Sequence, residues 1–304
     1  MCAFRATKLE YARCIVTAGR RWAWSLPGGA DGQNTRDIVF LYYDENGGRA
    51  LLPAPATLRN ILLVMLSLAA GCVDAAGFLG FDEVFVANMT GNTVLLGIAI
   101  GQADSEAVLH AVTALAAFIC GVAAGAIAVG WKQERDIWPK SVTLALAIEF
   151  AVLVGFAGAW LYTGAEPSGG ITFLLISLSA LAMGIQSSAV RRLGVPGVAT
   201  TYITGTLTNL TETAIDWLRT IRSPKISGED SEESPEPAPP SARGLLLPAD
   251  VWLAYGTGAV VGGAAQLLWW PMAVLFPAII VATVVFATVV FVATIRHRHD
   301  QTSG

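Results

Sequence analysis

The sequence predicts an all-α transmembrane protein with six spanning helices plus two re-entrant or broken segments, arranged as two inverted three-helix repeats. The first observation behind this prediction is the composition. Of the 304 residues, 54% are hydrophobic and only 14% are charged. The mean hydropathy is +0.57. Soluble domains are about one-quarter charged, so lipid is the expected surrounding of this chain. The other two observations are the lengths of the apolar stretches and a similarity between the two halves.

Six apolar stretches are long enough to cross a bilayer. About 20 helical residues, each rising about 1.5 Å, cross roughly 30 Å of hydrocarbon. We predict a spanning helix over each stretch. The stretches are Leu58–Leu79, Ala107–Gly130, Ser141–Tyr162, Ile171–Val190, Val251–Trp269 and Val274–Ile295.

Two further segments, Val84–Gly101 and Val198–Trp217, are shorter or more polar than the six stretches. The first contains Asn88 and Asn92, and the second contains a run of threonines that ends near Asn209. Each segment fits a full span, a broken helix, or a re-entrant segment that enters and leaves the bilayer on one side.

Basic residues in the connections distinguish these alternatives, because cytoplasmic loops are enriched in lysine and arginine. If both polar segments crossed, the loop Trp131–Lys140 and the pair Arg191–Arg192 would face outward. If neither crosses, both fall inside, together with the run Arg219–Lys225 and the tail Arg296–His299. We therefore predict six crossings of the cell membrane (the inner or plasma membrane), with both termini in the cytoplasm.

The two halves of the chain resemble each other. Leu66–Gly71, followed by Asp74, is similar to Leu178–Gly184, and Met89–Asn92 then matches Ile203–Thr206. Glycines four residues apart follow in each half, Gly121 with Gly125 and Gly258 with Gly262. Three crossings per half would give the halves opposite orientations, as in many secondary transporters. Shared glycine and alanine content is the alternative explanation of the likeness.

We therefore expect the chain to consist of six parts. Residues 223–248 are acidic and proline-rich, so they are expected to form a disordered linker that cannot bury enough surface to fold. The other parts are an N-terminal extension expected to be poorly ordered (1–56), membrane repeat 1 (57–162), the first part of membrane repeat 2 (163–222), its remainder (249–296) and a C-terminal tail (297–304).

The motifs of both halves resemble a known family. The run Gly71–Ala75, the stretch Val84–Thr93 and the segment Met183–Gln186, followed by Thr204–Thr206, are similar to the YoaK-like bacterial membrane family, a domain of unknown function. The resemblance covers Leu58 to Arg296 and implies a polytopic bacterial membrane protein. It implies no activity, and the N-terminal extension and the acidic linker lie outside the pattern.

Carboxylates at membrane depth are the first candidates for function, because each costs about 2.5–3.5 kcal/mol to insert and often marks a pathway. Asp74 is interpreted as an ion- or proton-coupling group or as an anchor for the re-entrant segment, and alternatively as an interfacial residue in contact with water. Glu149 lies near the middle of its span. It is interpreted as a proton relay or as a glutamate hydrogen-bonded within the bundle.

The two Thr-Gly motifs are the second group of candidates. A hydroxyl, a permissive backbone and an amide within one turn suit the lining of a polar cavity, and mutual pairing of the two segments is the alternative. Either interpretation places these groups inside the bundle. The substrate-pathway candidates are therefore Asp74, Asn88, Thr90, Gly91, Asn92, Glu149, Gln186, Thr204, Gly205, Thr206 and Asn209.

These features favour a small-solute or ion permease of the secondary-transporter type, with a non-transporting membrane scaffold or sensor as the alternative. No enzyme signature or cofactor motif is found, so we expect neither catalysis nor a cofactor. The cysteines and histidines lack metal-ligand spacing, and no metal is expected. The expected partners are the lipid bilayer and a small solute or ion. A net charge of −4 argues against nucleic acid, and a homo-oligomer is left open.

Overall fold

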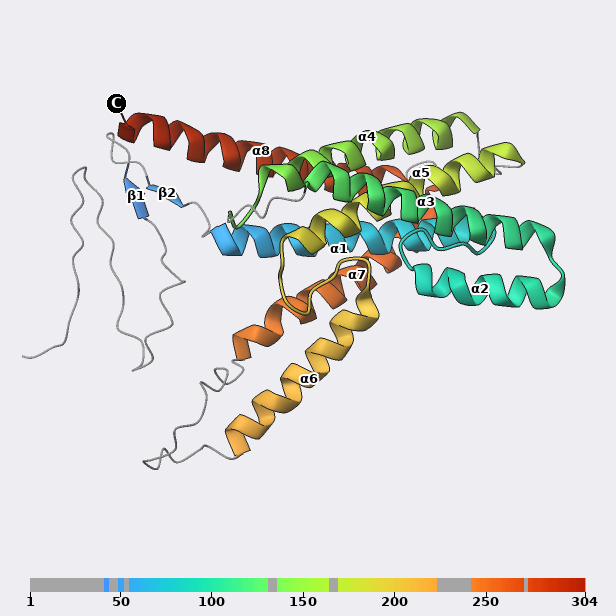
Figure 1. Ribbon diagram of the computed structural model, residues 1–304, viewed down its shortest axis with the longest axis horizontal. Coiled ribbons are helices and arrows are strands. Elements are labelled where there is room, and N and C mark those ends of the chain that lie inside the picture. The colour runs from blue at the N-terminus through green and yellow to red at the C-terminus, as the bar shows by residue number, and fades with distance from the viewer. Residues whose placement is uncertain are drawn as a thin grey trace, which may run out of the picture. The chain divides into compact units, whose positions relative to one another are not determined.

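A computed structural model describes residues 41–43, 49–51, 55–130, 136–163, 169–222, 242–270 and 273–303 (Figure 1). The chain forms two compact units, Met1–Arg59 and Asn60–Gly304. The elements are β1 (Leu41–Tyr43), β2 (Arg49–Leu51), α1 (Pro55–Gly80), α2 (Met89–Gln102), α3 (Ser105–Val129), α4 (Lys140–Thr163), α5 (Gly170–Arg192), α6 (Ile203–Arg222), α7 (Ala242–Leu268) and α8 (Leu275–Ser303).

The first unit contains a short hairpin. Strands β1 and β2 are antiparallel, with Leu41 opposite Leu51 and Tyr43 opposite Arg49. The hairpin falls within the predicted N-terminal extension. Residues 1–40 of that extension lie outside the described part of the chain.

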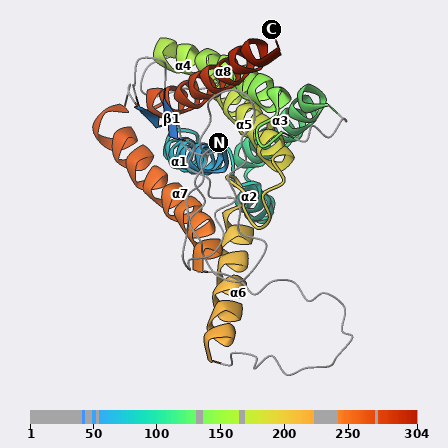
Figure 2. The same cartoon turned by 90° about the vertical axis from the view of Figure 1, so that its left-hand side faces the viewer.

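The second unit is helical. Six of its described helices are long and apolar enough to cross a membrane, namely α1, α3, α4, α5, α7 and α8, which confirms the six predicted spans. The polar segments form the remaining helices, α2 and α6. Helix α4 packs against α5 and α8, and α6 packs beside α7 (Figures 1 and 2).

Two described helices extend past the predicted boundaries. Helix α7 begins at Ala242, so residues 242–248 belong to a helix and not to the linker. Leu245–Leu247 supply apolar residues that extend the helix, and Pro248 is buried within it. Helix α8 continues to Ser303 through most of the predicted tail. The rest of the linker, residues 223–241, lies outside the described residues.

The chain between α1 and α3 returns to the end of the bundle that it left. Asp82, in the turn after α1, lies with its Oδ2 atom 3.6 Å from Nδ1 of His110, in the second turn of α3. The backbone at Val86 and Ala87 is hydrogen-bonded to Asp74, about two turns back along α1. The chain thus turns back beside α1. The 14-residue helix α2 then returns it toward the end of the bundle where α1 ends and α3 begins.

The chain between α5 and α7 behaves in a similar way at the opposite end of α1. Gln186, in the last two turns of α5, donates a hydrogen bond to the carbonyl of Leu66 in the first half of α1. Ser67 in turn donates to the carbonyl of Val251 in the first half of α7. The end of α5 and the start of α7 therefore lie toward the same end of the bundle.

Helices α1 and α7 approach each other so closely that only glycine fits at the contact. A Cβ atom at Gly71 would overlap the carbonyl of Tyr255 on α7. A Cβ at Gly258 would overlap the carbonyl of Leu68, and one at Gly262 would overlap that of Cys72. Small residues at i and i+4 permit such backbone contact between helices.

Helices α3 and α5 repeat this contact in the same order along the chain. The glycine of α5 is Gly184, and it faces a carbonyl of α3. The matching pairs are Gly184 with the carbonyl of Phe118, Gly121 with that of Leu181, and Gly125 with that of Ile185. The first helix of each half thus packs on the long helix after the polar segment of the other half. The paired glycines of both halves therefore serve close packing between helices.

Candidate functional site

Asp74 holds the turn that follows α1. Its Oδ1 atom accepts hydrogen bonds from the backbone N–H groups of Val86 at 2.8 Å, Ala87 at 2.6 Å and Asn88 at 3.3 Å. Its Oδ2 atom accepts from the Tyr255 hydroxyl of α7. The side chain is only 2% exposed, so the alternative of an interfacial aspartate in contact with water is wrong. The contacts are those of an anchor for the polar segment.

Asn92 closes the same turn from the other side. It accepts from the backbone N–H of Phe85 through Oδ1 at 2.9 Å and donates through Nδ2 to the carbonyl of Phe85 at 2.6 Å. Asn88 caps α2 by accepting from the N–H of Gly91 at 3.3 Å. A buried turn leaves backbone groups without ladder partners, and these amides supply them.

Thr206 makes the same kind of contact in the second half as Asn92 makes in the first. Its hydroxyl accepts from the N–H of Ala199 at 3.1 Å and donates to the carbonyl of the same residue at 3.1 Å. Both side chains lie at the fourth position of the matched motifs, and both are buried. One motif therefore forms the same side chain-to-backbone contact in each half.

Two motif residues do not face the interior. Thr90 and Thr204 are exposed, so the expectation that they lie inside the bundle is wrong. A helix turns about 100° per residue, so a residue two positions before a buried one lies on nearly the opposite face. The glycine of each motif, Gly91 or Gly205, lies against an aromatic ring, so an added Cβ would require the ring of Phe85 or Tyr202 to move.

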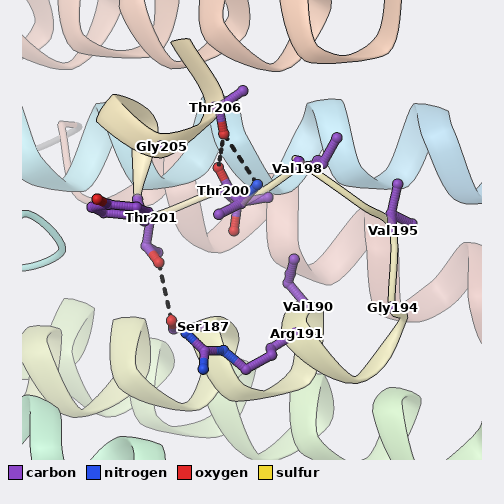
Figure 3. Close-up of a pocket in the computed structure, with 13 residues that line it drawn as sticks. Ser187, Val190, Arg191, Gly194, Val195, Val198, Thr200, Thr201, Gly205 and Thr206 are labelled. Carbon is purple, nitrogen blue, oxygen red and sulfur yellow. Dashed lines mark hydrogen bonds between the residues drawn. The ribbon is translucent and has the colours of Figure 1, made fainter. Parts of the chain in front are cut away.

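A cavity of about 320 Å³ lies between the last turns of α5, the following loop and the first turn of α6 (Figure 3). Glycines with φ of +61° and +70°, Gly194 and Gly197, allow the loop to turn around it. The lining residues with polar side chains are Ser187, Arg191, Thr200, Thr201, Tyr202 and Thr206.

Polar groups in the cavity are partly paired with one another. The Thr201 hydroxyl donates to that of Ser187 at 3.1 Å, as Figure 3 shows. Gln186 donates to the Thr200 hydroxyl at 3.1 Å and so connects the cavity wall to α1. Gln186 therefore joins α5 to α1. Arg191 is exposed and contributes a positive charge at the edge.

The candidate residues fall into separate groups. Asp74, Asn88, Gly91 and Asn92 gather at the first turn, and Gln186, Gly205 and Thr206 at the second. Asn209 lies behind the second turn, against Gly197. Glu149 is fully buried, and neither carboxyl oxygen has a hydrogen-bond partner among the described residues. The expectation that Glu149 is hydrogen-bonded in the bundle is not met there.

Three residues of the cavity were missed as site candidates. These residues are Ser187, Thr201 and Arg191. The hydroxyls of Ser187 and Thr201 are hydrogen-bonded to each other. The sequence led us to interpret Arg191 only as a marker of the cytoplasmic side. The signal available was the arginine five residues after Gln186 on the same helix, followed within ten residues by paired threonines.

Comparison with known proteins finds one family and one curated relative. The family described as "Protein of unknown function (DUF1275)" matches residues 62–288. The UPF0700 transmembrane protein YoaK of Bacillus subtilis (strain 168) is 36% identical over 233 residues, which cover 75% of this chain and 95% of that relative. No solved structure matches the chain.

Proposed function

This chain belongs to the DUF1275 family, as its motifs predict, and is a polytopic membrane protein; we propose, from the site described above, that it is a permease for a small solute or ion. The cavity at the start of α6 is the observation that carries the proposal. Its volume of about 320 Å³ suits a small molecule, and its polar groups converge from two helices and a loop.

The charge pattern of the cavity favours an anionic solute. The start of α6 carries the partial positive charge of a helix N-terminus, and the first turn of this helix contains no acidic residue. Arg191 adds a full positive charge, and Ser187 and Thr201 offer hydroxyls. Interrupted helices whose N-termini face an anionic group are typical of secondary transporters.

The contacts between the halves support an inverted repeat. Helices α1 and α7 run parallel, since Ser67 meets Val251 and Cys72 meets Gly262 further along both helices. The second half of α5 contacts the first half of α1 through Gln186. Two halves in opposite orientation, with a re-entrant segment in each, would open a route alternately to either side. In this arrangement both termini are cytoplasmic.

Flux through proteoliposomes tests the proposal. We expect the reconstituted protein to transport at least one of chloride, inorganic phosphate, acetate or lactate, with glycerol as the neutral reference. Arg191→Gln should raise the half-saturating concentration about 10-fold or more, because one charge-assisted hydrogen bond contributes about 1.5–3 kcal/mol. Thr201→Val should act in the same direction.

The matched control is Arg222→Gln, which removes the same charge from the exposed end of α6. It should leave the half-saturating concentration unchanged. Equal effects of Arg191→Gln and Arg222→Gln would contradict the assignment of the cavity. Absence of flux for every solute would contradict the permease and favour the scaffold or sensor alternative.

A further inference from the structure

Three potential metal ligands meet where α1 ends and α3 begins. Asp82 lies in the turn after α1, and Glu106 and His110 lie in the first two turns of α3. One ligand atom from each side chain lies within 4.8 Å of the other two. None of these residues belongs to the cavity at α6.

His110 is the most informative of the three. Its side chain is 1% exposed, and it packs against the ring of Phe173 with centroids 4.7 Å apart. Neither ring nitrogen has a hydrogen-bond partner among the described residues. Buried polar groups are nearly always paired, so this imidazole lacks something that it is placed to bind. Its Nδ1 atom faces Asp82.

The separation of one pair of ligand atoms is close to that found around a coordinated ion. Two ligand atoms that bind Zn²⁺ at about 2.1 Å in tetrahedral geometry lie about 3.4 Å apart. His110 Nδ1 and Asp82 Oδ2 are 3.6 Å apart, which is too long for a hydrogen bond and close to this separation. Asp82 and Glu106 are exposed, so small side-chain rotations would complete the set without moving the backbone.

The surrounding charge favours a cation. The sequence contains no lysine or arginine from Asn60 to Gly130, whereas Asp82, Glu83, Asp104 and Glu106 are all acidic. Asp104 is occupied as the N-cap of α3, where it accepts from two backbone N–H groups. The two remaining carboxylates nearest His110 would balance the charge of one divalent ion.

We propose that Asp82, Glu106 and His110 bind a divalent transition-metal ion, with Zn²⁺ as the leading candidate. One imidazole and two carboxylates form a nitrogen and oxygen set that suits first-row divalent ions, and water fills the open positions. The ion ties the turn after α1 to the start of α3. It would thereby hold together the two ends of the segment that contains α2. This inference does not depend on the proposed transport activity.

Calorimetric titration of the full chain in detergent with ZnCl₂ tests the proposal, after a chelator has removed bound metal. The wild type should bind one ion, and Asp82→Asn and Glu106→Gln should each weaken binding at least about tenfold, since even outer-shell partners contribute 10- to 100-fold. Glu83→Gln is the matched control, because it removes a neighbouring exposed carboxylate outside the set. Its affinity should equal that of the wild type.

A spectroscopic readout identifies the histidine. Co²⁺ bound to the wild type should give visible d–d absorption. The His110→Phe variant should lack this absorption. Without metal, the variant should have the same melting temperature as the wild type. If His110→Phe does not fold, the two exposed carboxylate variants decide the question. Absence of Zn²⁺ binding by the wild type, or equal weakening by Glu83→Gln and Glu106→Gln, would overturn the proposal.

Discussion

Replacing Asp74 by alanine is expected to lower the free energy of unfolding by about 3–5 kcal/mol, because each buried donor left without a partner costs about 1–3 kcal/mol. The substitution removes the acceptor of three backbone N–H groups and of the Tyr255 hydroxyl. The chain after α1 would then lose its attachment to that helix. Unfolding in mixed micelles of mild detergent and dodecyl sulfate measures the change.

Two milder variants separate the roles of the carboxyl oxygens. Asp74→Asn keeps an oxygen that can accept from the backbone, and Tyr255→Phe removes only the bond to Oδ2. Both should destabilise less than the alanine variant. Hydrogen exchange should accelerate most at the amides of Val86 and Ala87 in Asp74→Ala. A loss below about 1 kcal/mol, the worth of a single hydrogen bond, would contradict the anchor.

Two glycines two residues apart on α7 are expected to respond with opposite signs to alanine. Gly258→Ala should destabilise by about 1–3 kcal/mol, as overpacking does, because the added Cβ would overlap the carbonyl of Leu68. Gly256→Ala should stabilise by up to about 1 kcal/mol, since it faces open space and alanine favours the helix. The same micelle unfolding measures both changes.

The other half supplies the matching experiment. A Cβ at Gly121 would overlap the carbonyl of Leu181, in the same way as at Gly258. Gly121→Ala and Gly258→Ala should therefore destabilise by similar amounts. If either variant were as stable as Gly256→Ala, the close approach of the two helix pairs would be wrong.

Much of the fold could be predicted from hydropathy alone. A spanning helix needs a long apolar stretch, and each of the six predicted stretches coincides with a helix. The motifs also identified the family correctly. The ends of α7 and α8 were harder to predict, because Pro248 and the polar residues after Ile295 mark helix ends in most chains.

The contacts of the site were less predictable. Polarity identified the two segments, but the bond between Asp74 and Tyr255 joins residues 181 positions apart, and no local pattern announces it. His110 also escaped notice as a possible ligand. Glu106 lies four residues before it on the same helix, but Asp82 comes close only once the chain has turned back beside α1.

Both polar segments are expected to return to the face of the membrane from which they enter. Single cysteines at Glu83 and Gln102 bracket the first segment, and those at Arg191 and Arg222 bracket the second; all four residues are exposed. In a cysteine-free background, an impermeant maleimide added to intact cells should label the first pair. The second pair should react only after the cells are opened. Labelling of the two members of either pair from opposite faces would contradict re-entrant segments.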